Sequence, residues 1–439
     1  MKDHSQGPNQ PPTGESPGIA PSAADKRPPY ALRRADQSNL GDVIRMVSGA
    51  FGHPYDPKLV EVYERMFSPG ATWLATDGEA VVGSAAGAEL RLALPGGRET
   101  TGWGLTWVGV APTHRRQGIL RSLMTRHLDQ GREQGLPLGL LFAAESSIYG
   151  RFGYGAATHY ASYELSRRDG NLRDDLSLPV AEYRVDLLSL DQARARLPDA
   201  WERLRLERVG ELSRPDWVWA DWFFELEQDA SRANAALFIA ACSSHGERIE
   251  GFTAYYLDEN WERGYPEHTL QVREVVGSPP ARSRLWSYLL QLDLVGTLAV
   301  QTAPLDEPLR WMLRDPRRLR TKSTADGLYV RLFDVPKALA QRAYRGEGRI
   351  VLEVEDPLLP EVGGLFELLV ENGEAECRRT SSEPDLRLSA EALGAVYLGG
   401  VSFSVLAQAG RIRELRAQAL ARADSLFLWS PAPWCATVF

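Results

Sequence analysis

The stretch VAPTHRRQGILRSLM, from Val110 to Met124, follows the strand-like run GWGLTWVGV and opens a run with aliphatic residues at helical spacing. The first N–H groups of a helix have no intrahelical partner, and the helix dipole favours negative charge there. Gly118 lets a bulky anion approach the backbone, and Arg115 and Arg116 can add charge-assisted hydrogen bonds. The stretch therefore predicts either an anion-binding turn between strand and helix or a solvated helix cap with exposed arginines.

Around this turn, the sequence predicts an α/β layer fold over residues 30–168. A helix-spaced run, two strands around the Asp77-Gly78 turn, a third strand, the helix after Gly118 and a short apolar strand (LPLGLLF) follow one another. The wholly apolar last strand is typical of a strand buried on both faces of a sheet.

Residues 178–336 repeat this order of elements, which predicts a second, degenerate copy of the same fold. Its turn reads VGSPPARSR, and each of its two prolines removes a backbone donor. We therefore expect that the second copy does not bind the anion. Residues 337–439 alternate strands and helices as an α+β module. Residues 1–29 are rich in Pro, Gly and Ser, which predicts a disordered tail.

Composition narrows the function classes. The formal net charge is −8 over 439 residues, which argues against a nucleic-acid-binding protein and suits a cationic partner. The three cysteines are widely spaced, so they predict no disulfide framework and no metal site, and they fit a reducing cytoplasm. No apolar run reaches the ~20 residues that a membrane span needs. These features predict a soluble, cytoplasmic protein without a metal cofactor.

The runs VAPTHRRQGIL and SIYGRFGYG resemble those of the Eis (enhanced intracellular survival) N-acetyltransferases of the GNAT superfamily. The resemblance implies two tandem GNAT folds, a sterol-carrier-protein-like C-terminal domain and acetyl-CoA as cosubstrate. It also implies a cationic amine as acceptor and assembly as a homohexamer. Leu120 stands where the GNAT phosphate-binding motif usually has a small residue, which departs from the pattern.

The resemblance places acetyl-CoA along the end of the strand and in the turn that follows it. The cofactor-binding residues expected on this basis are Val108, Gly109, Val110, Arg115, Arg116, Gln117, Gly118, Ile119 and Leu120. Trp107 and Glu145 are candidates for the acceptor pocket, although Glu145 equally suits a cap of the loop before Ile148.

The family pattern also supplies an acid and a base. Tyr149 matches the tyrosine that protonates the departing CoA thiolate, and a phenol with a pKa of ~10 can do this while neutral. Tyr154 is interpreted as a packing residue. The base implied by the resemblance is the α-carboxylate of Phe439, a weak base until it is desolvated; the alternative is a frayed, solvated terminus.

Two further questions stay open at this point. The aromatic run RPDWVWADWFFELE, from Arg214 to Glu227, predicts either a helix packed between domains or a wall of the acceptor pocket, where rings face cations. The rival to an acetyltransferase of polyamines, aminoglycosides, lysines or one small amine is a non-catalytic lipid-binding or scaffold protein with inert GNAT folds.

Overall fold

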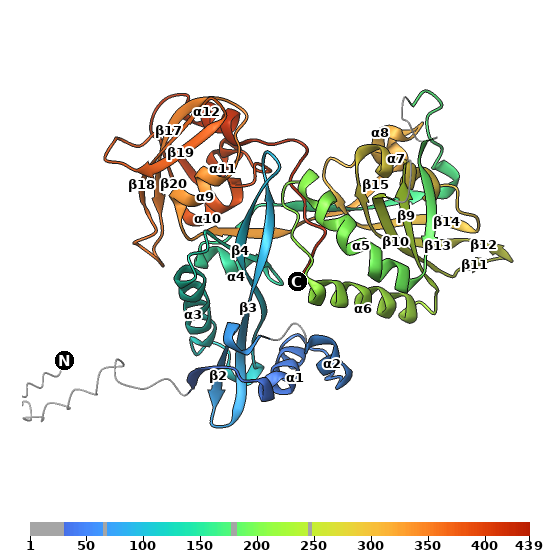
Figure 1. Cartoon of the computed structure of the whole chain (residues 1–439), viewed down its shortest axis with the longest axis horizontal. Helices are drawn as coiled ribbons and strands as arrows, with labels where there is room; N and C mark the ends of the chain where they lie inside the picture. Colours follow the sequence, from blue (N-terminus) through green and yellow to red (C-terminus); the bar gives the residue numbers. More distant parts are fainter. Residues whose placement is uncertain (1–29, 65–67, 177–181, 245–247) are drawn as a thin grey trace, which may run out of the picture.

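A computed structural model describes residues 30–64, 68–176, 182–244 and 248–439, and Figure 1 shows their arrangement. The predicted disordered tail, residues 1–29, lies outside the described residues. Within them the chain forms two seven-stranded sheets, one five-stranded sheet and a small two-stranded hairpin. The predicted fold class, with two α/β layers followed by an α+β module, is confirmed.

The first sheet has the strand order β1-β2-β3-β4-β5-β16-β6. Its strands are β1 (Ala31–Arg34), β2 (Thr72–Asp77), β3 (Ala80–Leu94), β4 (Arg98–Val110), β5 (Leu138–Phe142), β6 (Gly155–Ala156) and β16 (Leu328–Leu332). Helix α3 (Ile119–Glu133) packs on this sheet with its apolar face, including Leu123, Met124 and Leu128, all fully buried. Helix α1 (Leu40–Ala50) contacts β3 and β4 of this sheet, and α2 (Lys58–Tyr63) contacts α1.

The second sheet has the order β15-β7-β14-β13-β10-β9-β8. Its strands are β7 (His159–Ser166), β8 (Arg184–Leu188), β9 (Leu237–Ser243), β10 (Ile249–Asp258), β13 (His268–Gly277), β14 (Val295–Pro304) and β15 (Arg320–Asp326). Helices α5 (Leu190–Leu204) and α6 (Asp216–Arg232) share an aromatic core on this sheet, and α7 (Pro279–Leu289) belongs to a second core.

The two layers exchange strands, so the predicted boundaries at residues 168 and 178 do not separate the sheets. Strand β7, which the prediction assigned to the first layer, pairs with β14 and β15 of the second sheet. Strand β16, assigned to the second layer, pairs with β5 and β6 of the first sheet. The apolar pattern of a buried strand does not reveal which sheet it joins, and this explains the difference.

The third module packs directly on the first layer. Its strands are β17 (Gly348–Glu355), β18 (Gly364–Glu371), β19 (Glu374–Arg379), β20 (Leu386–Ser389) and β21 (Ile412–Glu414), and its helices are α9 (Val335–Gln341), α10 (Ala390–Val396), α11 (Phe403–Gln408) and α12 (Ala419–Phe427). One apolar core contains Leu140 and Val330 of the first sheet together with Leu352 and Phe366 of the third. Figure 1 shows the C-terminus returning from this module to lie between the two α/β layers, near α6.

Candidate active site

The turn between β4 and α3 has the backbone form of an anion-binding loop. Gly118 is the N-cap of α3 at a φ of 84°, which favours glycine, and no side chain caps the helix. Arg116 also has a positive φ, 63°, which is uncommon for a residue with a side chain. Ser122 N–H donates to the carbonyl of Gly118, so the donors of residues 119–121 precede the first turn of intrahelical bonds.

This turn borders a cavity of about 930 Å³, which is in the size range of small-molecule sites. Of the nine residues expected to bind the cofactor, eight line it: Val108, Gly109, Val110, Arg115, Arg116, Gly118, Ile119 and Leu120. Gln117 is exposed and is not among the lining residues. Arg121 and Arg151 also line the cavity and had not been predicted; Arg151 lies inside the run that carries Tyr149.

Strand β4 leaves its neighbour β5 just before this cavity. Parallel pairing runs from Gly102 and Leu138 to Leu105 and Leu141, and within the described residues the two strands do not pair beyond that point. On its other edge β4 bulges at Trp107, whose φ is 48° and whose carbonyl accepts a hydrogen bond of 2.6 Å from Ser84 Oγ. The end of β4, beyond Leu105, thus does not pair with β5 and borders the larger cavity.

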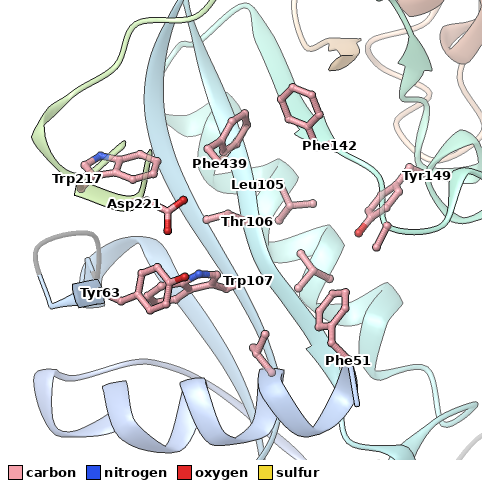
Figure 2. A pocket seen from close by; sticks show the side chains of 13 residues that line it. Phe51, Tyr63, Leu105, Thr106, Trp107, Phe142, Tyr149, Trp217, Asp221 and Phe439 are labelled. Carbon is pink, nitrogen blue, oxygen red and sulfur yellow. The ribbon is translucent and has the colours of Figure 1, made fainter. Parts of the chain in front are cut away.

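A second, smaller cavity of about 250 Å³ adjoins the first and is mostly aromatic (Figure 2). Its walls come from three parts of the chain: the first layer, helix α6 of the second layer and the end of the chain. The lining residues are Val47, Phe51, Tyr63, Leu105, Thr106, Trp107, Val108, Phe142, Ala144, Tyr149, Trp217, Asp221 and Phe439. Four residues line both cavities, Phe51, Val108, Ala144 and Tyr149, so the two spaces meet beside Tyr149.

Tyr149 ends the short helix α4 (Ser146–Tyr149) and is only 7% exposed. Burial, and secondarily the carboxylate of Glu145, raise its pKa to about 12. The phenol therefore stays protonated at neutral pH and is available as a proton donor. Tyr154 packs edge-on against it, with ring centroids 6.4 Å apart, and is fully buried outside both cavities, as the packing interpretation predicted.

The ring of Phe439 lines the smaller cavity (Figure 2). Its ring packs edge-on against Phe142, with centroids 5.8 Å apart. A Cβ at Gly104 of β4 would lie 2.7 Å from Phe439 Cε2, so the bare glycine makes room for this ring. The frayed terminus considered above is therefore not the arrangement observed.

A hydrogen-bonded clamp in the second layer holds the segment before Phe439. Trp434 N–H donates to the carbonyl of Val209 at 2.9 Å, and Ala436 N–H donates to Glu211 at 3.0 Å. Arg214 donates from Nε to the Thr437 hydroxyl at 2.9 Å.

Arg214 is itself fixed by a bidentate, buried pair with Glu274, at 2.8 and 3.1 Å. Arg214, Glu274 and Thr437 are all buried, and they satisfy one another's hydrogen-bonding groups. These bonds give the C-terminal segment one defined path.

The remaining predicted residues fall on different sides of the site. Trp107 lines the smaller cavity, whereas Glu145 lines the larger one. The aromatic run forms helix α6, and its side chains divide between two surroundings. Trp219, Trp222 and Phe223 are buried in the aromatic core that α5 and α6 share, while Trp217 and Asp221 line the smaller cavity.

Sequence reasoning missed Tyr63, Asp221, Phe51 and Phe142 as site residues. Only the aromatic run around Asp221 gave a signal, because rings next to a carboxylate suit a cationic ligand. Within the described residues, no group of three or more His, Cys, Asp or Glu side chains is placed to hold a metal ion. None of the helices described is both long and apolar enough to cross a bilayer.

Comparison with protein families agrees with this architecture. Residues 31–157 and 210–332 each match a model described as an acetyltransferase (GNAT) domain, and residues 335–436 match a sterol carrier protein domain. The chain is 33% identical to N-acetyltransferase Eis of Mycobacterium tuberculosis, over 80% of this chain and 84% of that protein. This chain belongs to the Eis-type GNAT N-acetyltransferases.

Other relatives support the Eis-type assignment. An uncharacterized N-acetyltransferase of Streptomyces coelicolor is 38% identical over 92% of this chain and 98% of its own length. The crystal structure of Eis1 from Mycobacterium abscessus superposes with a TM-score of 0.81 at 28% identity, covering 93% of this chain and all of that one. The chain is therefore an acetyltransferase, and GNAT enzymes of this kind use acetyl-CoA.

Proposed function

We propose that this enzyme transfers the acetyl group of acetyl-CoA directly to a primary amine, with Tyr149 as general acid and the α-carboxylate of Phe439 as general base. The observation that carries the proposal is the meeting of two chemically different cavities beside Tyr149. One is bordered by arginines and an uncapped helix start, which suit a diphosphate. The other is lined by aromatic rings, by Asp221 and by the C-terminal Phe439, and rings with carboxylates suit an ammonium group.

In this mechanism the residues around Gly118 bind the coenzyme diphosphate, and the end of β4 aligns the thioester between the cavities. Backbone N–H groups there, notably that of Val110, polarise the thioester carbonyl. The Phe439 carboxylate accepts a proton from the ammonium group, and the freed amine nitrogen forms a bond to the carbonyl carbon. The C–S bond then breaks, and Tyr149 gives its proton to the leaving sulfur. The second proton lost by the nitrogen returns to the Tyr149 oxygen through solvent, so the products are the amide and the CoA thiol, with one proton left on the carboxylate.

The acceptors that suit the site are polyamines and aminoglycoside-like amines, with protein lysines and single small amines as narrower alternatives. A panel of these amines, assayed for release of the CoA thiol, separates the classes. Failure of every amine, combined with no binding of acetyl-CoA, would favour the rival proposal of a lipid-binding scaffold. Assembly as a homohexamer, expected from the family, is likewise a proposal that light scattering tests.

The C-terminal base is tested by adding a few residues after Phe439. The addition displaces the carboxylate, so turnover should fall by about 10²–10⁴-fold, the usual contribution of a positioned acid or base. Acetyl-CoA affinity and the melting temperature should stay unchanged. The same residues added before Met1 are the control. Full turnover of the C-terminally extended chain would contradict the proposal.

A further inference from the structure

The smaller cavity has an acidic end that the acetyl-transfer step does not use. Asp221 enters the cavity from α6, and Figure 2 shows it beside Tyr63 and Trp217, on the opposite side from Tyr149 with Phe439 between them. Burial, followed by the charge of the Asp221 carboxylate, raises the pKa of the Tyr63 phenol, so the two groups lie close together. Tyr63 also packs edge-on against Trp107, with centroids 5.2 Å apart. One carboxylate is thus surrounded by three aromatic rings.

The charged groups that act on Asp221 are one carboxylate, Glu225, and one guanidinium, Arg273. Glu225 lies one turn further along α6 and adds negative charge. The cation that acts on Asp221 is Arg273 of β13, and its guanidinium is shared with Asp229, at 3.7 Å, and with Gln301, at 3.3 Å. Burial, followed by the charge of Glu225, raises the pKa of Asp221 to about 6. A carboxylate held in this way binds a cation favourably, because an ammonium group compensates its lost hydration.

We propose that Asp221, with Tyr63 and Trp217, forms a second cation-binding site that binds the distal ammonium group of a diamine or larger polycationic acceptor. The other amine of the same molecule then reaches the junction beside Tyr149. This inference rests on the proposed acetyl transfer for its reactive end, but the site itself follows from the cavity alone. It makes this enzyme selective for acceptors with at least two cationic groups.

The acceptor preference of Asp221→Asn tests this site. Matched pairs are compared: diaminobutane with butylamine, and diaminohexane with hexylamine. The wild-type enzyme should prefer one of the diamines in kcat/KM by about 10- to 100-fold, the range expected for a charge-assisted contact. Asp221→Asn should remove most of this preference, mainly by raising the KM for the diamine. Asparagine keeps the shape of the side chain and removes its negative charge.

Glu227→Gln is the matched control, because Glu227 lies on the same helix, pairs with Arg194 on the surface and does not line the cavity. It should keep the diamine preference. Equal use of monoamines and diamines by the wild type would overturn the inference, as would an unchanged preference in Asp221→Asn. A fall in melting temperature of Asp221→Asn without loss of preference would assign Asp221 to the packing of α2 on α6 only.

A binding measurement separates this inference from the proposed function. Calorimetry of diaminobutane and butylamine with the full chain does not require turnover. Tighter binding of the diamine, lost in Asp221→Asn, would support the site even if no amine were acetylated. Diamine binding without acetylation would contradict the proposed acetyl transfer but not the cation-binding site. Absence of any difference in binding, with normal turnover, would overturn the site and leave acetyl transfer standing.

Discussion

The two α/β layers share a strand-turn-helix frame but end in different helix starts. In the first, β4 leads to α3 through Gly118, and arginines border an open cavity. In the second, β13 leads to α7 through Gly277 and Ser278, and prolines occupy its first two positions. Proline has no N–H group, so α7 presents fewer donors than α3. The same frame therefore gives a helix start that suits an anion in one layer and a start with fewer donors in the other.

The arginines differ as well. Arg282 near the start of α7 is buried and paired with Glu307, which also accepts a hydrogen bond from Trp286 at 2.9 Å. The Thr302 hydroxyl of β14 donates to the carbonyl of Arg273 on β13 and bridges those two strands. In the second layer, the polar groups near the start of α7 are therefore paired with one another inside the protein. The contribution of this layer to the site is α6 and the clamp on the C-terminal tail.

The largest expected effect is on the chemical step in the first layer. Tyr149→Phe removes the proton donor, so turnover should fall by about 10²–10⁴-fold while acetyl-CoA affinity stays nearly intact. Tyr154→Phe is the matched control, because its hydroxyl is buried without a hydrogen-bond partner in the described residues. Steady-state kinetics with calorimetry measures both. Normal turnover of Tyr149→Phe would remove this tyrosine from the mechanism.

A smaller effect should distinguish the two helix starts. Replacement of Arg115 and Arg116 by alanine removes two cations from the larger cavity, and we expect the Kd for acetyl-CoA to rise by about 10- to 100-fold. Arg284→Ala in α7 is the corresponding change in the second layer and should leave the Kd unchanged. Its guanidinium donates to the carbonyl of Tyr183 at 3.0 Å, away from the cavity. Equal effects of the two changes would break the comparison.

The smallest effect concerns the clamp. Burial raises the pKa of Glu211 from 4.5 to about 8. The folded chain therefore holds a proton that the unfolded chain releases, and the free energy of unfolding should fall as the pH rises from about 4.5 to 8. Glu211→Gln removes this contribution, so its stability should depend less on pH across that window. Denaturant titrations at several pH values measure the slope; an unchanged slope would contradict the assignment.

Local parts of the site were predictable from sequence, and non-local parts were not. The turn at Gly118 could be predicted because a strand end, a glycine and a helix start are neighbours in the chain. Tyr149 followed from a contiguous motif. The exchange of β7 and β16 and the meeting of Tyr63 with Asp221 depend on packing between distant segments. Helical periodicity indicates which face of α6 is apolar but not which layer that face contacts.

The central claim is that the α3 start, and not the α7 start, binds acetyl-CoA, and calorimetry tests it most directly. The account predicts one acetyl-CoA per chain and loss of binding in Gly118→Val, because a β-branched residue is strained at a φ of 84°. Ser278→Ala at the start of α7 should bind normally. Two acetyl-CoA molecules per chain, or unchanged affinity of Gly118→Val, would contradict the account.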